Sequence, residues 1–268
     1  MKQATDQLGT THFFASTPRR IVSLVPSQSE LLYDLGLEEQ LVGITKFCVH
    51  PKHLLKSKTV IGGTKQVHWD KIKALQPDII ICNKEENTQE IVQTLSVIAP
   101  VWVTNVVTLS DNFQMIADFG LLFDKEPEAD ELKHRLQLAL TDFNFFMKTI
   151  PNQSAGYFIW KNPFMVAGSG TFIHELLALN CFDNFFGSQK RYPEIIIDVP
   201  SKYENLNLVL LSSEPYPFKT KDIAEIATFF PNASIRLVDG EYFSWHGSRL
   251  LKAISYFKKF QQELLCDF

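Results

Sequence analysis

The sequence predicts an α/β protein of two lobes, each built on a mostly parallel sheet, joined by one long helix. Short β-branched runs alternate with helical segments in both halves of the chain. Between the halves, residues 132–150 keep helical spacing and contain neither Gly nor Pro. A length of 268 residues is enough for two cores of modest size.

The first half begins with a β-branched run at 20–26, which predicts a buried strand. Ser27 and Glu30 follow at the spacing of a capping box, so we expect a helix with Ser27 as its N-cap. Gly36 marks the end of this helix. The alternation then predicts strands at 41–45, 59–61, 78–82 and 101–103, and helices at 70–75, 88–98 and 109–122.

The long central helix begins among acidic residues, with Pro127 in its first turn, and is ended by Pro151. At 1.5 Å per residue it extends roughly 35 Å, so we expect a stiff connection between the lobes. Further strands are predicted at 155–160, 206–211 and 234–238, and helices at 171–180, 221–229 and 248–265. The expected domains are therefore an N-terminal lobe at 1–123, a connecting helix at 124–150 and a C-terminal lobe at 151–268.

Composition and charge exclude several classes of protein. The chain has 26 Lys and Arg against 30 Asp and Glu, with no basic stripe, which argues against nucleic-acid binding. No apolar run approaches the roughly 20 residues of a membrane-spanning helix. The four cysteines are far apart and without metal-ligand spacing, so we expect buried thiols: Cys48, Cys82, Cys181 and Cys266.

No pattern of catalytic residues is present. The chain has no G-x-S-x-G elbow and no P-loop, and no G-x-G-x-x-G follows the first strand. We therefore expect a binding protein rather than an enzyme, with no catalytic residue, no intrinsic cofactor and no metal held by the protein.

Ligands of open α/β sheets bind where the strands end, so the loops after the strands are candidates. Aromatic residues and histidines are concentrated in these loops, which favours a large, flat or partly apolar ligand. The candidate ligand-binding residues are His50, Thr64, Asn83, Trp160, Phe164, Tyr192, Glu241, Trp245 and His246.

The run RRIVSLVPSQSELLYDLGL at 19–37 resembles the opening of the helical-backbone (class III) substrate-binding proteins of ABC importers. Those are periplasmic receptors for cobalamin, ferric siderophores and haem. Further matches are VGIT at 42–45, IGG at 61–63, IKALQPDIII at 72–81, NPFMVAGSGTFI at 162–173 and YPEI at 192–195. The likeness covers nearly the whole chain from about Asp6, and the cobalamin-binding subgroup is the closest.

The resemblance implies two lobes joined by a single helix, with a ligand cleft between them and no catalysis. It implies a monomer that captures a metal chelate and delivers it to the permease of an ABC importer. Two glutamates, one on each lobe, dock onto the transporter in this family. The matching positions here are Asp70 and Asp198, which keep the charge on a side chain one methylene shorter.

The resemblance also shows where this site departs from the cobalamin receptors. His50 replaces a typical Tyr, Thr64 and Asn83 stand where Trp is common, Tyr192 replaces another Trp, and Phe164 is retained. A corrinoid, a haem and an iron chelate all stay open as the ligand. For His50 and His246, an axial imidazole on the ligand's metal and an ordinary loop histidine are both open.

The cellular compartment of the protein leaves a second functional hypothesis open. The resemblance implies the cell envelope, whereas residues 1–17 lack the features of a secretory signal, as in a cytosolic protein or one whose leader was removed. The alternative is a cytosolic corrinoid or tetrapyrrole carrier, or a chelatase-like salvage enzyme, on the same scaffold.

Overall fold

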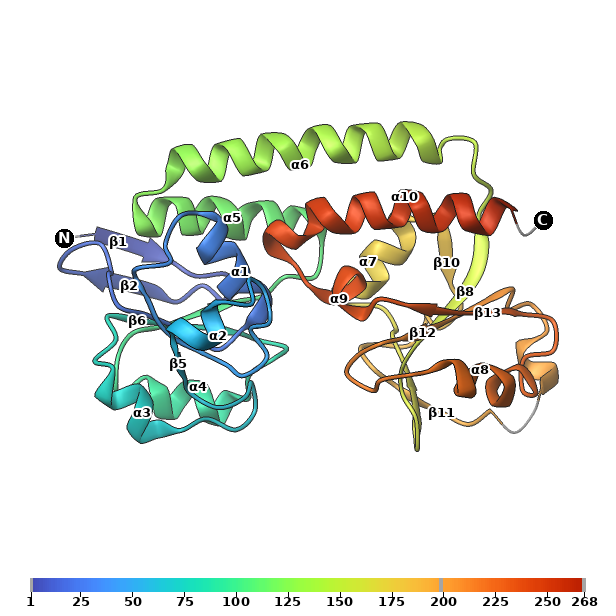
Figure 1. The fold of residues 1–268 in the computed structure, drawn as a ribbon, viewed down its shortest axis with the longest axis horizontal. Coiled ribbons are helices and arrows are strands. Elements are labelled where there is room, and N and C mark those ends of the chain that lie inside the picture. The colour runs from blue at the N-terminus through green and yellow to red at the C-terminus, as the bar shows by residue number, and fades with distance from the viewer. Residues whose placement is uncertain (1, 198–199, 267–268) are drawn as a thin grey trace. The chain divides into compact units, whose positions relative to one another are not determined.

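The computed structural model describes residues 2–197 and 200–266 and divides the chain into two compact units. Unit 1 contains the chain as far as Gln137 together with His246–Arg249, and unit 2 contains Leu138–Trp245 and the residues from Leu250 onward. Each unit combines a largely parallel sheet with helices, which confirms the predicted fold class (Figure 1). The expected domain boundaries at 123/124 and 150/151 stay a prediction.

Unit 1 is built on five parallel strands in the order β5-β4-β3-β6-β7. Their Ile and Val side chains form a core with α3 and α4, including Val22, Ile72, Ile80 and Leu95. The strands are β3 (Ile21–Ser23), β4 (Leu41–Ile44), β5 (Thr59–Val60), β6 (Ile79–Asn83) and β7 (Val101–Thr104). The helices are α1 (Pro26–Asp34), α2 (Leu54–Ser57), α3 (Trp69–Ala74), α4 (Gln89–Leu95) and α5 (Leu109–Phe123).

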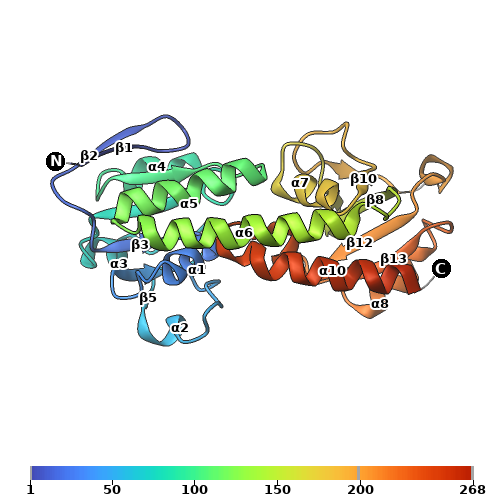
Figure 2. The same ribbon diagram turned by 90° about the horizontal axis from the view of Figure 1, so that it is seen from above.

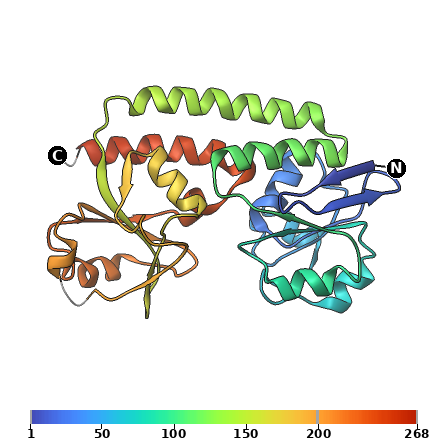
Figure 3. The same cartoon turned by 180° about the vertical axis from the view of Figure 1, so that it is seen from behind.

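An N-terminal hairpin, which the sequence analysis did not predict, precedes this sheet. Its strands β1 (Lys2–Thr5) and β2 (Thr11–Phe14) are mostly exposed, so they lack the apolar run that marks a buried strand. The Asp6 carboxylate accepts hydrogen bonds from the His12 ring and from the backbone N–H of Val103. Gln7 accepts from the N–H of Asn105 and donates to the carbonyl of Asp111 in α5. The hairpin therefore covers the edge strand β7 and lies against α5 (Figure 3).

The start of α1 corrects one expectation. Its N-cap is Val25, Pro26 occupies the first turn, and no side chain caps the helix, so the predicted capping box of Ser27 and Glu30 is wrong. Proline fits there because the first helical N–H has no partner within the helix. The predicted end is confirmed: Gly36 has φ +74° and the N–H of Leu37 donates to the carbonyl of Leu32.

Glu30 is instead half of a buried ion pair with Arg249, from the distant segment His246–Arg249. Arg249 Nε lies 2.7 Å from Glu30 Oε2 and Nη2 lies 3.0 Å from Oε1, and both residues are at most 3% exposed. Next to them, the N–H of Gly247, at φ +86°, donates to Asn112 Oδ1 of α5. The segment is thus held between α1 and α5 and forms part of the core of unit 1.

Unit 2 has a six-stranded sheet in the order β11-β9-β8-β12-β13, with β10 also paired to β8. Strands β8, β10, β12 and β13 run parallel, and β9 and β11 are antiparallel additions. The strands are β8 (Gln153–Trp160), β9 (Phe164–Val166), β10 (Phe182–Asn184), β11 (Glu194–Ile195), β12 (Leu208–Ser212) and β13 (Ser234–Val238). The helices are α7 (Phe172–Leu179), α8 (Thr220–Ala227), α9 (Gly240–Ser244) and α10 (Leu250–Cys266).

The long central helix is confirmed as α6 (Glu126–Met147), and the boundary between the units falls inside it. Within unit 2, its last turns lie beside α10 (Figure 2). The rings of Phe143 and Phe257 are 6.3 Å apart, and Lys258 Nζ lies 2.9 Å from Asp142 Oδ2.

The cysteines only partly follow expectation. Cys48 and Cys82 are buried, whereas Cys181 is half-buried and Cys266 is exposed near the end of α10. Among the described residues, no helix has the length and apolar character needed to cross a membrane.

The Glu30–Arg249 pair gives a prediction about stability. Replacing Glu30 with Gln removes the negative charge that faces a buried guanidinium, and breaking such a pair typically costs about 3–5 kcal/mol. We expect Glu30→Gln to lower the free energy of unfolding by that amount in urea denaturation followed by circular dichroism. The control is Asp142→Asn, which removes an exposed ion pair worth at most about 1 kcal/mol. Equal losses in the two variants would contradict the prediction.

Candidate functional site

The carboxyl edge of unit 1 consists of the loops at 45–50, 61–67 and 84–87, which follow β4, β5 and β6. Phe47 is 48% exposed there, with Lys46 Nζ 5.0 Å from its ring centroid. His50 and Thr64 are half-buried in the same loops. This edge therefore presents one aromatic surface among polar side chains.

Asn83, at the end of β6, shapes the loop that follows it. The side chain is 3% exposed, and its Oδ1 accepts hydrogen bonds from the N–H groups of Glu85 and Glu86. Asn87 closes the loop, because its Oδ1 accepts from the Asn83 N–H and its Nδ2 donates to the carbonyl of Thr64. Asn83 thus organises the loop internally, and its predicted contact with a ligand stays a prediction.

Glu86 has the most perturbed carboxyl at this edge. Burial raises its pKa above the usual range of Glu, and repulsion from Glu85 adds to the effect. A hydrogen bond with the Thr64 side chain and the positive charge of Lys65 act in the opposite direction. The carboxylate is therefore incompletely stabilised, and a further hydrogen-bond donor would favour its charged form.

A chain of buried hydrogen bonds connects this loop with His246. Asn83 Nδ2 donates to Thr104 Oγ1 at 3.0 Å, and Gln28 Nε2 donates to the same oxygen. Gln28 Nε2 also lies 2.9 Å from His246 Nε2, which therefore accepts. Burial lowers the pKa of His246 to about 4, so the imidazole is neutral near pH 7. His246 is 6% exposed, and its predicted role as a ligand contact or axial imidazole stays a prediction.

The carboxyl edge of unit 2 consists of Trp160 and the segments 213–219 and 239–245, which follow β8, β12 and β13. Trp160 is 39% exposed, and its ring meets that of Tyr216 edge-on at 5.7 Å. Trp245 is 9% exposed, and its Nε1 donates to Glu214 Oε1 at 3.0 Å, as does Ser244 Oγ at 3.1 Å. The edge thus presents the exposed Trp160 ring on a half-buried Tyr216, and it also contains an indole held by a carboxylate.

The other predicted residues of unit 2 lie in different settings. Phe164 packs edge-on against Phe158 and Phe229 in the core. Tyr192 is half-buried before β11, with the Arg191 guanidinium 5.7 Å from its ring centroid. Glu241 is half-buried in the first turn of α9. Their predicted contacts with a ligand stay predictions.

Of the two predicted docking residues, the structure describes Asp70 but not Asp198. Asp70 is exposed in the first turn of α3, where a carboxylate is stabilised by the helix N-terminus. Asp198 lies outside the described residues.

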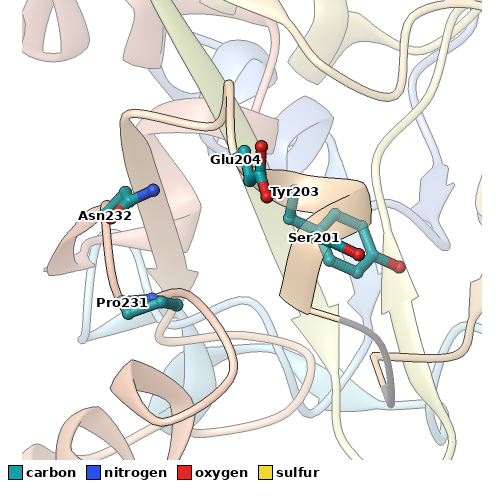
Figure 4. Close-up of a pocket in the computed structure, with 5 residues that line it drawn as sticks. All are labelled: Ser201, Tyr203, Glu204, Pro231 and Asn232. Atoms are coloured by element: carbon teal, nitrogen blue, oxygen red, sulfur yellow. The ribbon is translucent and has the colours of Figure 1, made fainter.

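Two hollows lie elsewhere in the units. Figure 4 shows one of about 120 Å³, lined by Ser201, Tyr203, Glu204, Pro231 and Asn232. Pockets for small molecules typically occupy roughly 300–1,000 Å³, so it is too small for a tetrapyrrole. A second, of about 310 Å³, includes Phe14, Pro77 and Pro100 and lies where the strands of unit 1 begin. Within the described residues, no cluster of three or more His, Cys, Asp or Glu side chains is placed to hold a metal ion.

Sequence reasoning did not select three residues at these edges as ligand contacts. Glu86 lies in the loop after the buried strand β6, and the loops after the strands were already the expected source of ligand contacts. Tyr216 and Glu214 also follow a buried strand, β12, but the pairing of Tyr216 with Trp160 depends on the parallel register of β8 and β12. That register is not visible in the sequence.

Comparison with known proteins identifies the family. Residues 21–214, well over half of the chain, match the model of a family described as periplasmic binding protein, and the chain belongs to this family. These are binding proteins of transporters and not enzymes.

Two relatives illustrate the range of similarity. The vitamin B12-binding protein of Pectobacterium carotovorum is 24% identical over 250 residues, covering 88% of this chain and 86% of that protein. An ABC transporter substrate-binding lipoprotein of Bacillus subtilis, YvrC, is 29% identical over 168 residues, or 60% of this chain. That match spans 53% of the relative's length.

Solved structures share the fold. The periplasmic vitamin B12-binding protein BtuF of Vibrio cholerae superposes with a TM-score of 0.77 at 19% identity, covering 92% of this chain and 98% of that one. The periplasmic haem-binding protein RhuT of a Roseiflexus species gives 0.77 at 16% identity, with 91% and 98% coverage. At these identities the likeness establishes the fold alone.

The buried His246 gives a prediction about pH. Its pKa is about 4 in the folded chain and about 6.5 when unfolded, so the unfolded chain binds the proton first as the pH falls. The stability present above pH 6.5 is therefore lost toward pH 4, by about 3 kcal/mol at most. Free energies of unfolding measured between pH 7 and 4 check this, with His246→Gln as the comparison. A variant with the same slope in this range would contradict the assignment.

Proposed function

We propose that this chain captures a corrinoid, or a related metal chelate such as haem or a ferric siderophore, and delivers it to the permease of an ABC importer. The observation that carries the proposal is the exposed ring of Trp160, packed edge-on against the half-buried Tyr216 at the carboxyl edge of unit 2. Aromatic faces supply large contact areas at low entropic cost, which suits a flat macrocycle. The B12-binding relative supports the corrinoid as the first choice among these ligands.

The same proposal covers partner and compartment. Relatives are periplasmic or lipoprotein substrate-binding proteins, which supports the cell envelope as the compartment. We propose that this chain works there as a monomer, and that Asp70 and Asp198 contact the permease. The exposed position of Asp70 supports the first of these contacts.

A titration tests the ligand class. We expect tryptophan fluorescence of the purified chain to be quenched by at least one of cobalamin, cobinamide, haem and a ferric siderophore, with saturation at micromolar concentrations or below. Quenching by none of the four would contradict the proposed function.

The aromatic pair is tested by substitution. Trp160→Ala removes a large exposed aromatic surface, and losses at such positions commonly reach tenfold to a hundredfold in affinity. The control is Phe145→Ala, because Phe145 is 72% exposed on α6 in the same unit and lies outside the carboxyl edge. Isothermal titration calorimetry with the chelate that binds measures the affinity of both variants. An equal, small change in the two variants would count against Trp160 as a ligand contact.

Docking is tested separately from binding. Because Asp70 is exposed, Asp70→Asn should leave ligand affinity unchanged and reduce uptake of the ligand through the importer by about tenfold. Uptake of labelled ligand by cells that express the importer measures this, with Asp130→Asn, an exposed carboxylate of α6, as control. Uptake that stays at the level of the control would remove Asp70 from the docking surface.

A further inference from the structure

The carboxyl edge of unit 1 differs in chemistry from that of unit 2. The exposed ring of Phe47 lies against Gly63, since a Cβ added there would be 3.2 Å from the ring. The carbonyl of the next residue, Thr64, accepts a hydrogen bond from Asn87 in the loop that carries Glu86, so the Phe47, Thr64 and Glu86 loops adjoin. A ligand at this edge therefore meets a hydroxyl and a carboxyl as well as an aromatic face.

The loop that holds Glu86 is fixed from beneath. The Glu86 N–H donates to Asn83 Oδ1 at 3.3 Å, and Asn87 Nδ2 donates to the Thr64 carbonyl at 2.8 Å, which ties the loop to Thr64. Asn83 Nδ2 donates to the hydroxyl of Thr104, which also accepts from Gln28, and both Thr104 and Gln28 are fully buried. The carboxyl is consequently presented on a supported backbone, and little reorganisation is needed when a ligand binds.

We infer that Glu86 is a specificity-determining residue that accepts a hydrogen bond from an N–H donor of the ligand and disfavours a ligand whose periphery is anionic. This inference rests on the proposed function and narrows its ligand class. A corrinoid carries neutral carboxamides around its ring, whose N–H groups suit a carboxylate acceptor. A haem carries two propionate carboxylates, which a half-buried negative charge repels.

The electrostatics of the edge support this choice. Burial and the neighbouring Glu85 raise the pKa of Glu86, and a hydrogen bond from a ligand N–H favours its charged form. Lys46, Lys65 and Lys84 are exposed at the same edge and offer charges to an anion. Exposed lysines contribute little because water and salt screen them, whereas the half-buried carboxylate is screened less.

The test compares two ligands in one variant. Glu86→Gln keeps the shape of the side chain and removes its charge, so we expect affinity for cobinamide to fall about tenfold, as for the loss of a charge-assisted hydrogen bond. Affinity for haem should stay constant or increase. Quenching of tryptophan fluorescence measures cobinamide, the absorption shift of the Soret band measures haem, and thermal unfolding checks that the variant is folded.

The matched control is Glu90→Gln, which removes the same charge from an exposed position in the first turn of α4. It should leave both affinities unchanged. Equal effects of Glu86→Gln on the two ligands, or none on either, would overturn the role of Glu86 while leaving the proposed function in place. An unmodified chain that binds haem but not cobinamide would also overturn it. If the unmodified chain binds no chelate of the panel, the proposed function itself fails.

Discussion

The architecture of unit 1 depends on one buried contact between distant parts of the chain, the pair of Glu30 and Arg249. A guanidinium at 3% exposure is tolerated because the carboxylate meets it with two oxygens. The pair is 219 residues apart in sequence, so unit 1 is complete only when the segment after α9 has been added. The same segment brings His246 against Gln28, and through Thr104 and Asn83 it supports the loop of Glu86.

The carboxyl edges of the two units differ in chemistry. Unit 2 has the paired rings of Trp160 and Tyr216 and the indole of Trp245, which donates to the Glu214 carboxylate. Unit 1 has the Thr64 hydroxyl and the Glu86 carboxyl on two adjoining loops whose backbone is fixed by Asn83 and Asn87. Apolar contact supplies affinity with little selectivity among flat macrocycles, whereas a half-buried charge discriminates between peripheral groups. Under the proposed function, Thr64 and Asn83, which stand where the resemblance implies Trp, would change the kind of recognition at this edge.

Most of the regular structure was predictable, because buried strands such as Ile79–Asn83 and the long helix Glu126–Met147 have strong periodicity of their own. The hairpin at Lys2–Thr5 and Thr11–Phe14 was not, since its stability comes from contacts of Asp6 and Gln7 with β7 rather than from an apolar pattern. Glu30 was wrongly predicted to close a capping box. Its spacing from Ser27 suggests a local cap, whereas its actual partner, Arg249, is distant in the sequence and cannot be recognised from spacing. For the site, the loops and Trp160 were predictable from the sequence. The pairing of Trp160 with Tyr216 was not, because it depends on strand register, and the approach of Thr64 to Glu86 was not, because it depends on how two loops close.

The N-terminal hairpin has a consequence for the behaviour of the protein at high concentration. A parallel sheet with free edges is a template for adding strands from other molecules. On one side the sheet of unit 1 ends in the two residues of β5, which is too short to recruit a neighbour. On the other side, Asp6 and Gln7 occupy backbone N–H groups that an incoming chain would need. Proteolytic removal of the first 14 residues would uncover Val101–Thr104, a β-branched and aromatic segment suited to cross-β stacking, so these residues protect the protein against aggregation.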